Sequence, residues 1–132
     1  MILLNTSFFT TFCDPSLSRI VVNITSGASR IPFPSLHLYC SGKAARDMFF
    51  RVLSAEEPSI RVLTYAPGFV DTYMLRDLEA NSSSTPIRKL VNGFRQDGEI
   101  LTPEATVADL ERVLEDNAFE NADHVDYYHQ TA

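Results

Sequence analysis

The hydrophobic pattern divides the first half of the chain into a strand, a long helix and a second strand. Ile20 to Ile24 is a short run rich in β-branched residues, which is typical of a buried strand in a parallel sheet. From Leu36 to Glu57 apolar residues recur at three- and four-residue spacing up to Pro58, which predicts a long helix. The next strand is predicted by the apolar residues Ile60, Val62, Leu63 and Tyr65, and Pro67-Gly68 closes it. This order predicts a βαβ unit with parallel strands, so the expected fold class is α/β.

The segments outside this unit are less regular. Met1 to Phe12 is apolar and is compatible with either a helix or a strand. In chain order we further expect a loop over Gly27 to Pro34, a short helix over Asp71 to Glu79, a polar loop over Asn81 to Pro86, a helix over Ile87 to Phe94, a helix that Thr102 caps with Pro103 at its first position, and a final strand over His124 to Tyr128.

Composition and charge narrow the possible partners. The 132 residues, 45 % of them hydrophobic and 21 % charged, suit an ordinary globular domain. The net charge of −6 is uneven, because Asp97 and the residues after it include ten acidic residues and one basic residue. Such an acidic end does not suit a phosphate backbone, so we expect no nucleic-acid partner.

Membrane and metal partners are not expected either. No apolar run approaches the roughly 20 residues of a membrane-spanning helix, and Met1 to Leu4 lacks the basic flank of a signal peptide. Cys13 and Cys40 are too few for a disulfide framework or a zinc site, which favours a reducing cytosol. His37, His124 and His129 show no metal-ligand spacing, and we expect surface or capping roles for them.

Tyr39 and Lys43 are the first candidates for chemistry. They are four residues apart on the predicted helix, so their side chains share a face. A neighbouring ammonium lowers the pKa of a phenol, which suits a general acid that protonates an alkoxide, although a surface tyrosine beside a lysine has the same spacing. Ser26 follows the first strand, and its hydroxyl could hold a carbonyl oxygen beside Tyr39. Pro67-Gly68 follows the second strand, so all these features converge on one edge of the predicted sheet.

These motifs resemble those of the short-chain dehydrogenase/reductase family, whose fold is Rossmann-like. The matching stretches are Val22-Asn23-Ile24-Thr25-Ser26, Tyr39-Cys40-Ser41-Gly42-Lys43, and Tyr65-Ala66-Pro67-Gly68 with Asp71-Thr72. Three more, Ala44 to Met48, Leu53 to Pro58 and His124 to Tyr128, resemble members that use NADPH to reduce side-chain ketones of 6-substituted pterins in tetrahydrobiopterin biosynthesis. The resemblance runs from about Met1 to the end of the chain.

The resemblance implies a role for each matching residue. Ser26 would polarise the substrate carbonyl, Tyr39 would donate the proton, and Lys43 would bind the nicotinamide ribose. Asp126 would anchor the pterin, because a carboxylate accepts two parallel hydrogen bonds from an amino-pyrimidinone. Gly27 and Gly68 would line the substrate beside Ser26 and Asp126. The implied cofactor-binding residues are Tyr39, Lys43, Val70, Asp71, Thr72, Tyr73, Met74 and Leu75.

The sequence also departs from the family pattern. None of its five glycines forms the G-x-G-x-x-G turn that binds a dinucleotide. We therefore expect the C-terminal catalytic and substrate-binding portion of a single Rossmann-like domain, with about three parallel strands and flanking helices and with the N-terminal dinucleotide-binding half absent. The resemblance also implies a homodimer through the helices at Met1 to Phe12 and Leu36 to Glu57. Two alternatives stay open: a non-catalytic fragment that acts as an interaction module, and a short-chain carbonyl reductase of other specificity.

Overall fold

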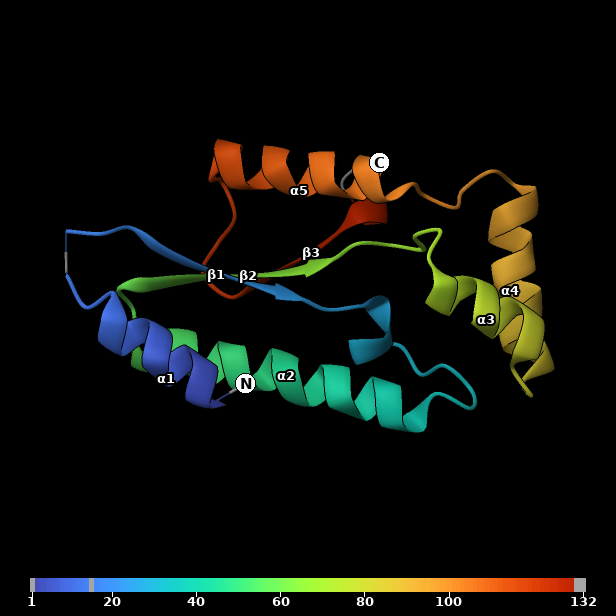
Figure 1. Cartoon of the computed structure of the whole chain (residues 1–132), viewed down its shortest axis with the longest axis horizontal. Helices are drawn as coiled ribbons and strands as arrows, with labels where there is room; N and C mark the ends of the chain where they lie inside the picture. Colours follow the sequence, from blue (N-terminus) through green and yellow to red (C-terminus); the bar gives the residue numbers. More distant parts are fainter. Residues whose placement is uncertain (1, 15, 130–132) are drawn as a thin grey trace.

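A parallel sheet lies between helices in the computed structural model, which describes residues 2–14 and 16–129. Within these ranges the sheet has three strands in the order β1 (Arg19–Ile24), β2 (Ile60–Ala66) and β3 (Asp123–Asp126). The helices α1 (Ile2–Thr11) and α2 (His37–Glu56) cover one face, and α5 (Pro103–Asp116) covers the other (Figure 1). Beyond one end of the sheet lie α3 (Tyr73–Asn81) and α4 (Thr85–Gln96), and two 3₁₀ helices complete the order, η1 (Gly27–Ser29) and η2 (Tyr127–His129). The predicted α/β class with three parallel strands is confirmed.

The strand register brings the carboxyl ends of all three strands to one edge. Ile24 pairs with Tyr65 in β2, and the ladder continues as the Thr25 N–H donates to the Tyr65 carbonyl at 2.8 Å. On the other side of β2, Ala66 pairs with Asp126. The residues that follow β1 and β3 therefore meet beside the end of β2, and α2 begins at this same edge (Figure 1).

Each face of β2 contributes to its own apolar cluster. Towards α1 and α2, Phe50, Ile60 and Val62 are buried, with Phe9 packed against them. Towards α5, Leu63 and Tyr65 pack with Val113 and Phe119. The Tyr65 hydroxyl donates a hydrogen bond to Asp109 Oδ2 at 2.9 Å, and burial is the main reason why the pKa of this phenol lies above its ordinary value. A buried strand that packs on both faces explains why Ile60, Val62, Leu63 and Tyr65 on β2 are all apolar.

Local signals account for most element boundaries. Thr102 caps α5 as predicted, because its side chain accepts a hydrogen bond from the Ala105 N–H at 3.1 Å with Pro103 in the first turn. The prediction for α4 was wrong at its start: the helix begins at Thr85, inside the expected polar loop, because Pro86 is compatible with a first turn.

The structure settles the ambiguous segment near the N-terminus and corrects the predicted end of the last strand. The ambiguous segment at the N-terminus is helical over Ile2–Thr11, and Met1 lies outside the described residues. The last strand ends at Asp126 rather than at Tyr128, and a 3₁₀ turn follows in which the Tyr128 N–H donates to Asp126 Oδ1 at 3.0 Å. Among the described residues, no helix has both the length and the apolar character needed to cross a bilayer.

Candidate active site

Ser26 lies one residue beyond the end of the β1 ladder and caps η1. Its backbone is extended, and its Oγ accepts a hydrogen bond from the Ala28 N–H at 3.2 Å. Because a hydroxyl both accepts and donates, this bond leaves the Ser26 hydrogen for an acceptor such as a carbonyl oxygen.

Lys43 fastens α2 to the end of β1. Its ammonium donates to the Ile24 carbonyl at 3.0 Å and reaches the Thr25 carbonyl at 3.4 Å. Nζ also lies 5.6 Å from the centre of the Tyr39 ring, which confirms that Tyr39 and Lys43 share a helix face. Burial lowers the pKa of Lys43, the charge of Arg46 lowers it further, and the Asp47 carboxylate acts in the opposite direction.

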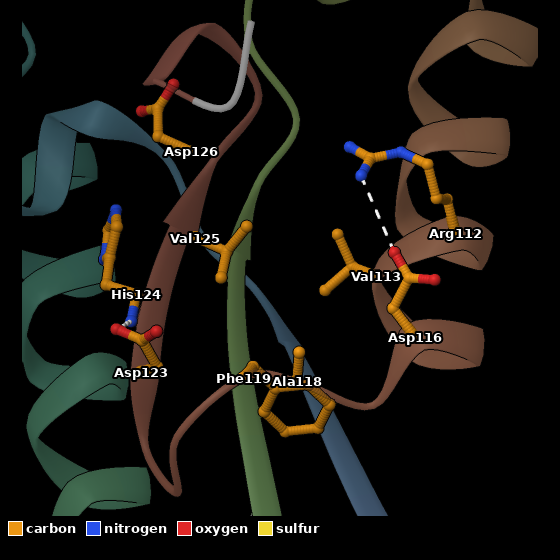
Figure 2. Close-up of a pocket in the computed structure, with 9 residues that line it drawn as sticks. All are labelled: Arg112, Val113, Asp116, Ala118, Phe119, Asp123, His124, Val125 and Asp126. Atoms are coloured by element: carbon orange, nitrogen blue, oxygen red, sulfur yellow. Dashed lines mark hydrogen bonds and ion pairs between the residues drawn. The ribbon is translucent and has the colours of Figure 1, made fainter. Parts of the chain in front are cut away.

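Asp126 comes to this edge from the far end of the sequence. Its Oδ2 lies 3.9 Å from the place that a Cβ would occupy on Gly27, so the carboxylate adjoins the segment that follows Ser26. Figure 2 shows Asp126 and His124 on the side of β3 towards η1 and α2, whereas Val125 points towards α5. Asp126 also lines a pocket of about 310 Å³ between β3 and α5.

The predicted cofactor segment after β2 begins with a left-handed turn. Gly68 has a φ of +76°, and a Cβ on it would lie 2.9 Å from side-chain atoms of both Leu101 and Tyr128. Val70 forms an isolated bridge with Leu101. Leu101 and Tyr128 therefore pack directly against this turn. A glycine fits there because it has no side chain to clash with them and adopts a positive φ without strain.

The remaining predicted cofactor residues have different surroundings. The Asp71 carboxylate accepts hydrogen bonds from Arg76 at 2.8 and 3.0 Å, which lower its pKa, and Thr72 caps α3 by accepting from the Leu75 N–H. Tyr73 is 84 % exposed and Met74 is also exposed, whereas Leu75 is buried. The exposed side chains are open to a ligand, and that of Leu75 packs into the interior.

The expectation of a surface role for His124 was wrong. Its side chain is only 6 % exposed, and Nδ1 lies 3.6 Å from Asp47 Oδ2. Burial lowers the pKa of His124, as does the charge of Arg30, against the opposing effect of nearby carboxylates. His37 is exposed as expected, and the surroundings of the His129 side chain lie outside the description. Within the described residues, no group of three or more His, Cys, Asp or Glu side chains could hold a metal ion.

Asp47 and Asn23 are further polar residues of this region that the sequence reasoning missed. Asn23 Nδ2 donates to Asp47 Oδ1 at 2.9 Å, although Asn23 lies in the β-branched run of β1. An amide side chain inside an otherwise apolar strand was the feature of the sequence that could have pointed to this polar contact.

Comparison with known proteins supports the family that these features define. Residues 2–83 match the family profile described as short chain dehydrogenase. Sepiapterin reductase from Bos taurus is 42 % identical over 126 residues, which are 95 % of this chain and 47 % of that protein. The chain thus spans about half the length of the relatives that it matches.

Solved structures agree with the fold. The KRED1-Pglu enzyme superposes with a TM-score of 0.78 at 26 % identity, over 92 % of this chain and 53 % of that one. The angucycline C-6 ketoreductase LanV with bound NADP gives a TM-score of 0.62 at 23 % identity, over 92 % of this chain and 48 % of that one. The chain belongs to the short-chain dehydrogenase/reductase family. Within it, the chain is similar to sepiapterin reductases over almost its whole length.

Proposed function

We propose that this chain supplies the catalytic and substrate-binding part of an NADPH-dependent reductase that acts on side-chain ketones of 6-substituted pterins, as in tetrahydrobiopterin biosynthesis. The observation that carries the proposal is the convergence of Ser26, Tyr39, Lys43 and Asp126 on the carboxyl edge of the sheet. Similarity to sepiapterin reductase supports the choice of substrate. The fold shared with LanV, which holds NADP, supports a nicotinamide cofactor.

The residues at this edge fit the nicotinamide end of NADPH. The Lys43 ammonium has three hydrogens and two carbonyl partners, so one donor is left for a ribose hydroxyl. Gly68 and the segment from Val70 to Leu75 would line the cofactor. When bound, the cofactor supplies the hydride, and the protein supplies orientation and the proton.

Ser26 and Tyr39 act on the substrate oxygen. The Ser26 hydroxyl donates a hydrogen bond to the ketone oxygen and stabilises the negative charge that develops there. The Tyr39 phenol then gives its proton to that oxygen, which completes the alcohol, and the phenolate regains a proton from solvent. Because the half-buried Lys43 ammonium is close to the ring, it stabilises this transient phenolate. Asp126, beside Gly27, accepts hydrogen bonds from the pterin ring and fixes the ketone near Tyr39.

The test measures NADPH oxidation with sepiapterin as substrate. We expect Tyr39→Phe to lower kcat by about 10²- to 10⁴-fold, the usual contribution of a general acid. Lys43→Met should also lower kcat, and Lys89→Met on the exposed surface of α4 is its matched control. Equal rates for the wild type and Tyr39→Phe would contradict the role of Tyr39.

Two further measurements separate the alternatives. If Asp126→Ala abolishes turnover of sepiapterin but not of a simple diketone, Asp126 anchors the pterin; loss of neither favours a carbonyl reductase of other specificity. Equilibrium dialysis with NADPH tests the non-catalytic alternative, because a chain that neither binds NADPH nor turns over substrate acts as an interaction module instead.

We also propose a homodimer through α1 and α2. Leu38 is 80 % exposed and Met48 is 55 % exposed on α2, and Phe12 beside α1 is exposed as well. Large apolar side chains gathered on one pair of helices are typical of an interaction surface. Light scattering should give twice the chain mass, and Met48→Glu should give the monomer. A cytosolic setting is part of the proposal, and the free thiols of Cys13 and Cys40 support it.

A further inference from the structure

A row of polar side chains crosses the sheet just N-terminal to the strand ends that carry the candidate active site. Asn23 pairs with Thr64, and Thr64 pairs with His124. Register partners in a parallel sheet point to the same face, which here is the face that α2 covers. Asn23 and Thr64 are 1 % and 2 % exposed, so the row is buried where parallel strands normally place apolar residues.

Asp47 of α2 joins the two ends of this row. One carboxylate oxygen accepts the 2.9 Å hydrogen bond from Asn23 on β1, and the other lies 3.6 Å from His124 Nδ1 on β3. Arg46 Nη2 donates to Asn23 Oδ1 at 3.0 Å, so both ends of the amide are paired. A cleft of about 180 Å³ lies at the same place, lined by Asp47, Thr64 and His124 among others. One side chain therefore contacts the strands on both sides of β2.

Asp47 and the two residues that it contacts lie near residues of the proposed mechanism, both along the chain and on the same faces of α2 and β3. Asp47 follows Lys43 by four residues and Tyr39 by eight, so all three lie on one face of α2. Lys43 holds the Ile24 carbonyl while Asp47 holds the side chain of the preceding residue, which fixes both the rotation and the height of α2 on β1. His124 precedes Asp126 by two residues and points to the same side of β3 (Figure 2).

The Asp47 carboxylate fixes the position of α2 on the sheet and does not stabilise the fold through its burial. Asp47 is 14 % exposed, and taking a charge out of water is costly even when hydrogen bonds are made. An apolar side chain would cover the sheet without that cost, but it would not fix the helix at one height. The charged groups that face His124 are Asp47 from α2, Asp123 and Asp126 from β3, and Arg30 from the segment after η1.

We propose that Asp47 is a positioning residue that, through Asn23 and His124, sets the separation between Tyr39 on α2 and Asp126 on β3. The proposal rests on the reductase function proposed above. A pterin held by Asp126 and protonated by Tyr39 depends on that separation. A small diketone needs only Ser26 and Tyr39 at its carbonyl and can shift to meet them, because Asp126 does not hold it.

The experiment compares the two substrates in the full chain with NADPH. Asp47→Asn should lower kcat/KM for sepiapterin by about 10- to 100-fold, the scale of a displacement of about 1 Å, and should change kcat/KM for the diketone less than about twofold. His124→Gln breaks the same connection from β3 and should show the same selective loss. Asp97→Asn, an exposed residue distant from the site in sequence, is the matched control and should leave both substrates unchanged.

Failure of this proposal is distinct from failure of the reductase function. A wild-type chain that reduces neither substrate refutes both. If the wild type is active, equal losses on the two substrates would show that Asp47 only supports the fold, and no loss on either would show that it positions nothing. If Asp47→Asn does not fold by circular dichroism, His124→Gln decides between these outcomes.

Discussion

Replacement of Gly68 by alanine tests how tightly the turn after β2 is held. Gly68 has a φ of +76°, a conformation that costs an L-residue about 1–2 kcal/mol. An added Cβ would also lie 2.9 Å from Leu101 Cδ1 and from Tyr128 Cε2. Tyr128 cannot yield freely, because its hydroxyl accepts from the Phe69 N–H at 3.0 Å and donates to the Glu99 carbonyl at 3.2 Å. Overpacking of this kind costs about 1–3 kcal/mol.

Gly98 provides a matched control for the backbone term. Its φ is +73°, but no atom lies within 4 Å of its Cβ position. The strain and the unfolded-state entropy are common to the two substitutions, so the difference between them isolates the clash at Gly68. We expect Gly68→Ala to lose about 1–3 kcal/mol more free energy of unfolding than Gly98→Ala.

Urea unfolding followed by circular dichroism measures this difference. With an m-value of about 2 kcal/mol per molar, the two midpoints should lie about 0.5–1.5 M apart. Equal midpoints would refute the reasoning, because they would mean that Leu101 and Tyr128 move aside at no cost. In a Tyr128→Ala background the clash with Tyr128 is absent. Gly68→Ala should therefore lower the free energy of unfolding less in that background than in the wild type.

Substitutions at three further positions test a buried tyrosine, a buried histidine and a helix cap. Tyr65→Phe should cost about 1–3 kcal/mol in urea unfolding, because it removes the buried hydrogen bond to Asp109; no loss would show that the bond contributes nothing. Since burial lowers the pKa of His124, the unfolded chain binds more protons, so stability should fall as the pH drops below the ordinary value of 6.5, and His124→Gln should remove this part of the pH dependence of the melting temperature. Thr102→Ala should cost about 1 kcal/mol and Thr102→Ser much less, because serine keeps the oxygen that caps α5.

The elements that were predicted well from the sequence are those whose ends are marked by a proline, a glycine or a capping residue. Pro58, Pro67-Gly68 and Thr102-Pro103 mark boundaries through backbone sterics and capping, and α2, β2 and α5 end or begin within one or two residues of them. The end of β3 has no such mark: Tyr127 and Tyr128 are residues that favour a strand, but a hydrogen bond from the Tyr128 N–H to Asp126 turns the chain into a 3₁₀ helix.

The candidate site divides in the same way. Tyr39 and Lys43 could be paired from their spacing alone, because a helix brings residues four apart together. Asp126 could not, because its place beside Gly27 depends on two strand ladders, and only a family resemblance pointed to it. The Asn23, Asp47 and His124 contacts join three elements, and no local pattern specifies which amide, carboxylate and imidazole will meet.

The same ladders determine how rigid the candidate site can be. Ser26 follows a strand paired with β2 on one side, and Asp126 ends a strand paired with β2 on the other. Their separation is therefore set by the spacing of neighbouring strands rather than by the loops that connect them. Tyr39 is placed differently, because it belongs to a helix whose position on the sheet depends on side-chain contacts. A substitution that loosens α2 would thus move Tyr39 while Ser26 and Asp126 stay in place, and substrate orientation would be affected more than substrate binding.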